Sequence, residues 1–158
     1  FATKEKRIQK EILTMRKSPP PGIRLCEDSL RSAPEFMVEL TGATGTLYSE
    51  QIFKLLFKFG ERYPFESPQV TFVGNCIPVH PHVYSNGHIC LSILTEDWSP
   101  ALSTEAVCLS VISMLSSCTE KKLPPDNAFY IRTCSKNPKD TKWWFHEIMA
   151  RFTNIIIH

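Results

Sequence analysis

The first pattern along the chain is an apolar stripe with the period of a helix. Ile8, Ile12 and Met15 recur at i, i+4 and i+7, which places them on one face of an amphipathic helix. The opposite face is basic and polar, with Arg7, Lys10, Thr14 and Lys17. The prolines and glycine at 19–22 must end the helix, because proline has no backbone N–H to donate. The pattern therefore predicts a helix over residues 3–17.

Beyond residue 22 the apolar positions alternate with a period of two, as in half-buried strands. The alternating side chains are Phe36, Val38 and Leu40, then Phe53, Leu55, Phe57 and Phe59, and finally Val70 and Phe72. Short connections join these runs, namely a glycine-containing turn at 42–45 and a proline-rich stretch at 63–68. Such connections favour an antiparallel meander with one face buried.

A long stretch without periodicity follows at residues 74–102, and helical spacing then returns. Its prolines and apolar residues favour an ordered, functional loop over a disordered one. Ser103 can cap a helix that would cross the sheet with Val107, Cys108, Val111, Met114 and Leu115. Two further helices are predicted, one from Pro124-Pro125-Asp126 and one from Asn137-Pro138. A helix, then strands, then helices indicate an α+β fold.

Composition narrows the class of protein. A chain of 158 residues has the length of a single domain. Its net charge of +2 is close to balanced and gives no reason to expect a polyanionic partner for the whole molecule. The basic first helix has no aromatic platform beside it, so we expect no nucleic-acid binding. Neither a run of about 18 apolar residues nor a basic-then-apolar leader is present, which predicts a soluble protein of the cytoplasm or nucleus. The six cysteines are then expected to be reduced and mostly buried.

Most of the candidate chemistry lies between residues 80 and 100. Three of the five histidines, His80, His82 and His88, surround an Asn86-Gly87 turn and precede Cys90. A loop cysteine near polar groups is a candidate nucleophile, because the thiolate is the reactive form. The spacing leaves three alternatives open: a buried structural thiol; a hydrolase triad of Cys90 with His88 or His82 and Asp97; and a zinc site of His80, His82, His88 and Cys90.

The order of several motifs resembles the ubiquitin-conjugating enzymes over nearly the whole chain. The matching elements are the basic stretch 6–11, Tyr63-Pro64-Phe65 with Pro68, His80-Pro81, the stretch 85–91 around Cys90, and the stretch 98–102. The stretches 80–84, 95–98 and 142–144 resemble the W-type branch of that family, which modifies protein N-termini. The resemblance implies an α+β fold with an N-terminal helix, a four-stranded antiparallel meander, a long active-site loop, a central helix and C-terminal helices. It also implies a catalytic domain over residues 1–150 and a short tail at 151–158.

The same resemblance implies an activity and its partners. Cys90 would accept the ubiquitin C-terminus as a thioester from the activating enzyme and pass it to an amine, with a RING or U-box ligase holding the substrate. No cofactor is expected here, because ATP is used by the activating enzyme. The ligase-contact residues would be Arg7, Lys10, Phe65, Ser99, Pro100 and Ala101. Lysine-directed conjugation and a non-catalytic ubiquitin-binding scaffold are the alternatives.

Departures from the family pattern bear on the acceptor. His82 stands where the family has Asn, so it has either an oxyanion role or a structural role in the loop. Ser92 stands where many lysine-directed members have Asp, and Asp126 could supply an acid or cap a helix. At pH 7 about 14% of an α-amine is free base against about 0.04% of a lysine amine, so an α-amine needs less help. The sequence therefore favours flexible protein N-termini as acceptors, although the ending 148–158 does not resemble the W-type tail.

Overall fold

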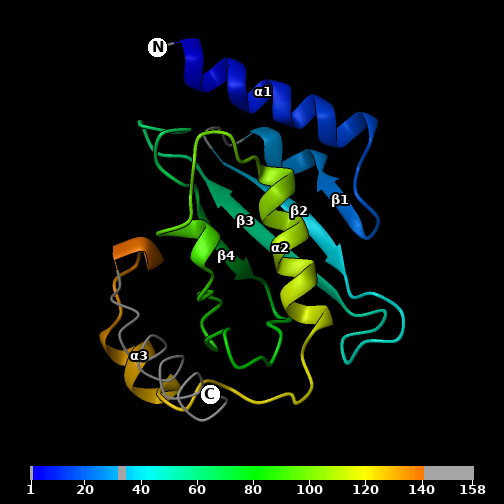
Figure 1. Cartoon of the computed structure of the whole chain (residues 1–158), viewed down its shortest axis with the longest axis vertical. Helices are drawn as coiled ribbons and strands as arrows, with labels where there is room; N and C mark the ends of the chain where they lie inside the picture. Colours follow the sequence, from blue (N-terminus) through cyan, green and yellow to red (C-terminus); the bar gives the residue numbers. More distant parts are fainter. Residues whose placement is uncertain (1, 32–34, 141–158) are drawn as a thin grey trace, which may run out of the picture.

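The computed structural model describes residues 2–31 and 35–140 (Figure 1). The helices and strands in chain order are α1 Ala2–Lys17, β1 Ile23–Cys26, β2 Glu35–Thr41, β3 Ile52–Lys58, β4 Gln69–Val73, α2 Thr104–Ser116 and α3 Asn127–Thr133. Short 3-10 turns lie at η1 Glu27–Arg31, η2 Ser92–Leu94 and η3 Pro138–Asp140. This order confirms the predicted α+β fold.

The four strands form one antiparallel sheet in the order β1-β2-β3-β4. Val38 pairs with Leu55, and Leu55 pairs with Phe72, so the alternating apolar side chains share the buried face. The meander is therefore confirmed. Alternation alone identified β2, β3 and β4, whereas the four residues of β1 are too few for that pattern to stand out.

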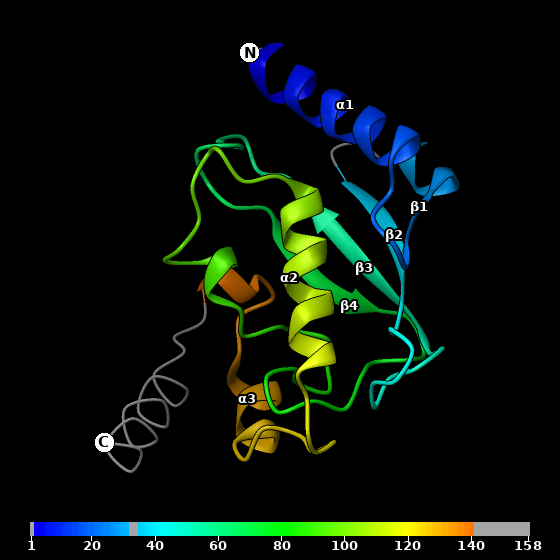
Figure 2. The same cartoon turned by 45° about the vertical axis from the view of Figure 1, so that its right-hand side comes forward.

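Helix α2 crosses the buried face of the sheet (Figures 1 and 2). Ser103 caps it as predicted, because its side-chain oxygen accepts a hydrogen bond from the Ala106 N–H at 3.2 Å. Val107, Cys108 and Val111 are fully buried in the same apolar core as the strands. Burial of this stripe between helix and sheet gives the domain its one continuous core.

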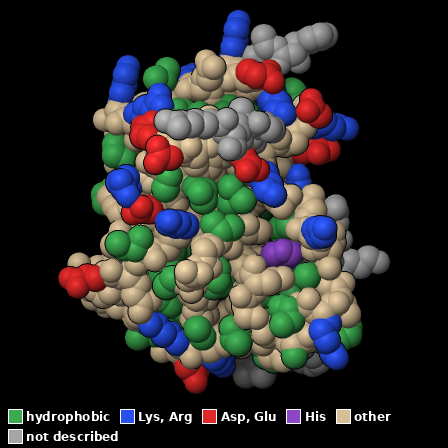
Figure 3. All heavy atoms as spheres, turned by 180° about the vertical axis from the view of Figure 1, so that it is seen from behind, with side chains coloured by type: hydrophobic (Ala, Val, Ile, Leu, Met, Phe, Trp, Pro, Cys, Tyr) green, Lys and Arg blue, Asp and Glu red, His purple; other side chains and the backbone are tan. Residues whose placement is uncertain are grey.

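The opposite face of the sheet is not covered by a helix of the described chain. Seen from behind, hydrophobic and charged side chains alternate across it (Figure 3). The pleat turns every second residue of a strand toward this face. On β1 and β2 these residues include Arg24 and Glu39, which form an ion pair.

Helix α1 lies at one end of the sheet and α3 at the other (Figure 1). The predicted stripe of α1 is confirmed, since Met15 is buried and Ile8 and Ile12 pack against the core. Of the helix predicted from Asn137-Pro138, the described residues include only the 3-10 turn η3, and the rest of that prediction lies outside the described residues. The predicted boundary at residue 150 lies outside the described residues. No helix in the described part of the chain is long and apolar enough to cross a membrane.

Candidate active site

Cys90 lies on a hairpin within the long segment that connects β4 to α2. The Cys90 N–H donates to the His82 carbonyl oxygen at 2.9 Å, and the Tyr84 N–H donates to the His88 carbonyl oxygen at 2.9 Å. The Asn86-Gly87 turn closes the hairpin, because the Gly87 N–H donates to the Tyr84 carbonyl oxygen at 2.9 Å. The Cys90 side chain is half-buried at the end of this hairpin. The segment is thus ordered by its own backbone hydrogen bonds.

Gly87 joins the hairpin to the sheet. The Phe72 N–H of β4 donates to the Gly87 carbonyl oxygen at 2.9 Å. Gly87 has a φ of 93°, and a Cβ built there would lie 2.0 Å from the Phe72 carbonyl oxygen. Only glycine allows both the left-handed conformation and this close backbone approach.

His80 supports the start of the hairpin as a neutral imidazole. Its Nδ1 accepts from the His82 N–H at 2.9 Å, and its Nε2 lies 3.1 Å from the Met114 carbonyl oxygen. Since Nδ1 accepts, Nε2 carries the proton and donates to Met114. Burial lowers the pKa of His80, which agrees with the neutral form.

His82 contributes to the hairpin through its backbone. Its N–H and carbonyl oxygen are bonded to His80 and Cys90 respectively. The ring is exposed at the rim of a surface hollow of about 260 Å³ shared with Met114 and Glu120. Neighbouring protein atoms still remove part of its solvent, so desolvation lowers the pKa of His82.

The other side of the hairpin is clamped to α3. The Tyr84 ring stacks on Tyr130 with ring centroids 3.6 Å apart, and the Tyr84 hydroxyl lies 3.1 Å from both carboxylate oxygens of Asp126. His88 Nδ1 lies 2.8 Å from the Tyr130 hydroxyl. Burial, with the Asp126 charge second, raises the pKa of Tyr84, so its hydroxyl stays protonated and donates.

Asp126 occupies the N-cap position of α3, in agreement with the capping role expected for it, but it does not cap through its side chain. Asp126 directly precedes α3, but its carboxylate makes no capping hydrogen bond and instead accepts from Tyr84. Asn127 adds a second clamp to the hairpin turn. Its Oδ1 accepts from the Ser85 N–H at 2.9 Å, and its Nδ2 donates to the Ser85 hydroxyl at 3.0 Å. Sequence reasoning did not find these contacts, because the partners are 42 positions apart.

Ser92 follows the cysteine as an exposed side chain at the start of η2. Its carbonyl oxygen accepts from the N–H groups of Thr95 and Asp97, each at 3.0 Å, which fixes the turn after Cys90. Within residues 2–31 and 35–140, no three His, Cys, Asp or Glu side chains are arranged to hold a metal ion. The zinc alternative therefore has no support from the geometry.

The six cysteines are all thiols without disulfides, and only one agrees with the expectation of burial. Cys108 in α2 is fully buried, and burial raises its pKa to about 12. Cys76 is exposed, and the remaining four, Cys90 among them, are half-buried. The expectation that most are buried is wrong, because five of the six lie on strand β1, on loops or at helix ends rather than in the core.

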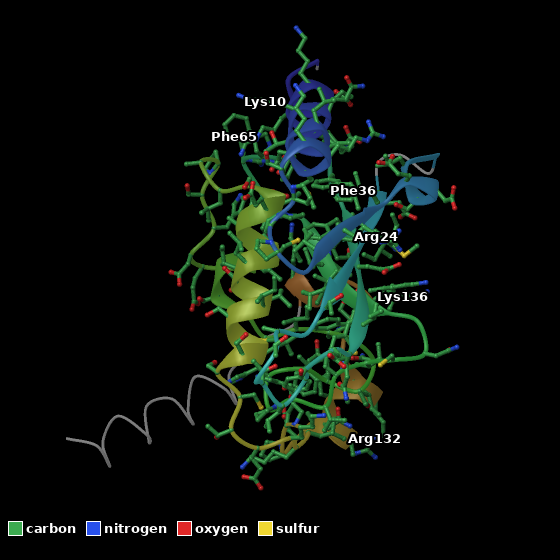
Figure 4. The ribbon with its side chains drawn as sticks, turned by 90° about the vertical axis from the view of Figure 1, so that its right-hand side faces the viewer. Lys10, Arg24, Phe36, Phe65, Arg132 and Lys136 are labelled. Carbon is green, nitrogen blue, oxygen red and sulfur yellow. The ribbon has the colours of Figure 1, made fainter. Side chains whose placement is uncertain are left out.

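The residues predicted to contact a ligase lie at the α1 end of the molecule. Lys10 and Phe65 are found at this end, with Arg132 of α3 at the opposite end (Figure 4). Phe65 is 69% exposed, which is unusual for so large an apolar side chain. The Trp98 indole N–H donates to the Pro64 carbonyl oxygen at 2.9 Å and so joins the Phe65 loop to the turn at 99–101.

Ser99, Pro100 and Ala101 form that turn. The Ala101 N–H donates to the Ser99 hydroxyl oxygen at 3.1 Å, while Pro100 and Ala101 are exposed. Ala101 shares a hollow of about 320 Å³ with Arg7 and Lys10 of α1. The structure therefore brings together all three segments of the predicted ligase surface.

Arg7 differs from its predicted place on a solvated outer face. Its guanidinium donates to the Leu102 carbonyl oxygen and lies 3.6 Å from the Glu11 carboxylate. The side chain is only 26% exposed, because the segment that leads into α2 packs against this side of α1. Lys10, one turn further, is exposed as predicted.

Comparison with known proteins identifies the class. Residues 7–147 match the family described as "Ubiquitin-conjugating enzyme". The chain therefore belongs to the ubiquitin-conjugating enzyme family, and its α+β architecture is the fold of that family. Membership makes the chain an E2 enzyme, whose partners are ubiquitin, a ubiquitin-activating enzyme and ubiquitin ligases.

Individual relatives are similar over most of the chain. "Probable ubiquitin-conjugating enzyme E2 W-A" of Danio rerio is 63% identical over 148 residues, which cover 93% of this chain and 98% of that protein. "Ubiquitin-conjugating enzyme E2 W" of Caenorhabditis elegans is 53% identical over 143 residues, with 90% and 94% covered. The crystal structure of the ubiquitin-conjugating enzyme UbcA1 from Agrocybe aegerita matches with a TM-score of 0.80 at 41% identity, covering 87% of this chain and 99% of that one.

Proposed function

We propose that this E2 enzyme carries ubiquitin on Cys90 and transfers it to the α-amino group of flexible protein N-termini, with a RING or U-box ligase. In the first step the Cys90 thiol attacks the thioester on the activating enzyme. A new thioester forms on Cys90, and the activating enzyme regains its thiol and the proton. In the second step the acceptor nitrogen attacks, an amide forms, and Cys90 regains its thiol.

The position of Cys90 carries the first part of this proposal. Its hairpin is bonded to β4 through Gly87 and clamped to α3 through Tyr84, so the sulfur sits on a fixed support. A thioester is already activated, and a fixed support supplies the orientation that acyl transfer requires. No cofactor is needed for this chemistry, since ATP is used upstream. We place the reaction in the cytoplasm or the nucleus.

The acceptor follows from the acids near Cys90. Ser92 offers no carboxylate after the cysteine, and the Asp126 carboxylate already accepts from Tyr84. The acceptor must then supply free base without help from a nearby acid. The higher free-base fraction of an α-amine at pH 7 is a difference of about 3.5 kcal/mol relative to a lysine amine. The resemblance to the W-type branch supports the same acceptor.

His82 takes a supporting part in this proposal. The two hydrogen bonds that join it to His80 and Cys90 come from its backbone, and its ring centroid lies 5.7 Å from that of His80. In its neutral form the imidazole can donate one hydrogen bond, and we assign that bond to the oxyanion in the loaded state. The backbone contacts make loop support its main role.

One experiment separates the alternatives. The protein is loaded with ubiquitin, activating enzyme and ATP, and the product is run on gels with and without reductant. We expect a reductant-labile adduct with the wild type and none with Cys90→Ala. The loaded protein is then mixed with the carboxamide of Nε-acetyl-lysine, which has a free α-amine like that of a peptide, or with the carboxamide of its isomer Nα-acetyl-lysine, which has a free side-chain amine; the two are named below without the amide.

We expect Nε-acetyl-lysine to discharge the thioester at least about tenfold faster than Nα-acetyl-lysine does. This is less than the roughly several-hundred-fold difference between the free-base fractions of the two amines at pH 7. Equal rates would reject the N-terminal acceptor and favour lysine-directed conjugation. No labile adduct on the wild type would reject the acyl transfer and favour a non-catalytic scaffold.

A further inference from the structure

A carboxylate is buried beneath the proposed ligase surface. Glu11 lies on α1 and is only 7% exposed, although it is one of the most polar residue types. Burying a charge is costly unless it is paired and hydrogen-bonded. Desolvation raises the pKa of Glu11 even though its hydrogen bonds and the nearby Arg7 charge favour the ionised form. Keeping the charged carboxylate in this site therefore costs folding free energy.

The contacts of Glu11 come from three separate segments. Oε2 accepts from the Tyr63 hydroxyl, and Oε1 accepts from the Thr104 N–H at 2.7 Å. The Arg7 guanidinium lies 3.6 Å away on α1 and donates to the Leu102 carbonyl oxygen. One side chain therefore bonds to its own helix, to the loop that carries Tyr63, and to the N-terminus of α2.

Each of these segments also carries one part of the ligase surface. Arg7 is in contact with Glu11, Phe65 is two residues beyond Tyr63, and the turn 99–101 ends three residues before Thr104. Tyr63 packs against Phe59 and Trp98, with ring centroids 4.7 and 6.1 Å apart, and is buried. Its ring is thus held in the core, while its hydroxyl points to Glu11.

A buried carboxylate is a poor means of stabilising a fold, because well-packed apolar residues of similar volume do as well or better. Its particular property is geometric. Its two oxygens accept from two directions at once and so fix the segments that donate to them.

We propose that Glu11 is a positioning residue for ligase binding, whose carboxylate holds α1, the Phe65 loop and the 99–101 turn in the one arrangement that presents the ligase surface. The inference rests on the ligase partnership of the proposed function and on the ligase-contact residues predicted from the sequence. It adds that the surface is assembled from within by a residue that a ligase does not touch.

The test uses the full chain and a purified RING domain that stimulates discharge by the wild type. Three variants are compared: Glu11→Ala removes both acceptors, Glu11→Gln keeps the shape and one acceptor oxygen for the Thr104 N–H while its amide N–H can donate to the Tyr63 hydroxyl oxygen, and Tyr63→Phe removes one donor without altering the surface. Glu5→Ala is the matched control, an exposed carboxylate on the same helix. Phe65→Ala tests the surface itself. Thermal unfolding sets an assay temperature at which every variant is folded.

We expect Glu11→Ala to raise the RING concentration for half-maximal stimulation by about five- to tenfold, within the usual range of coupling between sites. Tyr63→Phe should raise it about two- to fivefold, and Glu11→Gln should return it to within about twofold of the wild type. Glu5→Ala should not change it. Ubiquitin loading is measured in parallel, so that a general loss of activity is recognised.

Two results overturn the inference. If Phe65→Ala weakens RING stimulation but Tyr63→Phe and folded Glu11→Ala do not, then Glu11 only contributes to stability. If Phe65→Ala also has no effect, the proposed ligase surface is wrong and the inference falls with it. Should Glu11→Ala fail to fold, Tyr63→Phe alone decides between these outcomes.

Discussion

The Tyr84 hydroxyl lies 3.1 Å from each carboxylate oxygen of Asp126, across 42 positions of the chain. Tyr84 belongs to the hairpin that ends at Cys90, and Asp126 lies directly before α3. The pair therefore connects the candidate nucleophile to the C-terminal part of the described structure. It also occupies the Asp126 carboxylate, which the sequence suggests as a possible acid for the acceptor amine.

Removing this pair should loosen the hairpin. We expect Tyr84→Phe and Asp126→Asn each to lower the free energy of unfolding by about 1–2 kcal/mol, because the first removes the donor and the second removes the charge on the acceptor of a partly buried hydrogen bond. The double variant should lose less than the sum, since both changes act on the same interaction. Urea unfolding measures the three values. Asp97→Asn, an exposed carboxylate in the same loop, is the control, and strict additivity would show that the pair does not act as a unit.

The contact of Gly87 with β4 predicts a larger effect. Gly87→Ala should cost more than about 2 kcal/mol of unfolding free energy, because a Cβ would overlap the Phe72 carbonyl oxygen and the residue has a positive φ. Gly60→Ala is the matched control, since a Cβ there meets no atom within 4 Å. Chemical denaturation of both variants gives the comparison. A stable Gly87→Ala protein would mean that the hairpin does not lie against β4 as described.

The absence of a carboxylate after Cys90 predicts a gain of activity. Ser92→Asp should raise the rate of thioester discharge by Nα-acetyl-lysine several-fold, because an acid at this position can orient and deprotonate a lysine amine. Discharge by Nε-acetyl-lysine should change little, since an α-amine is already partly free base. Ser92→Asn separates the effect of charge from that of shape. An equal change for both isomers would contradict a role for residue 92 in choosing the acceptor.

The buried histidines predict a loss of stability in mild acid. Burial lowers the pKa of His80 and of His88 below the usual value near 6.5, so the unfolded chain binds more protons as the pH falls through that value. The free energy of unfolding should then fall between pH 7.5 and 5.5, by at most about 1.4 kcal/mol per pH unit for each group. Glu11 opposes this at lower pH, because its pKa is raised and the folded state takes up its proton first.

Urea unfolding across this range checks the sign. His88→Gln should flatten the pH dependence, since it removes one of the two buried imidazoles, whose Nδ1 faces the Tyr130 hydroxyl. His82 makes a further contribution in the same direction, because desolvation also lowers its pKa. Stability that rises on acidification from pH 7.5 would show that the imidazoles are charged in the folded protein.

The sequence was sufficient for the features that depend on local periodicity. The stripe of Ile8, Ile12 and Met15 located α1, and the alternation around Val38 and Leu55 located the strands and their buried face, because both patterns record which side of an element leaves water. The order of short motifs around Cys90 was likewise enough to indicate the family. These signals are contained in neighbouring residues and need no knowledge of distant contacts.

The tertiary structure alone decided which distant side chains meet. Glu11 accepts from Thr104 across 93 positions, Arg7 on the basic face of α1 donates to Leu102, and the Asp126 carboxylate accepts from Tyr84 while making no capping bond to α3. A hydrogen bond forms wherever folding brings a donor and an acceptor within about 3 Å, and no periodic pattern along the chain records that meeting. The elements were therefore predictable from the sequence, whereas the polar contacts that position the candidate site were not.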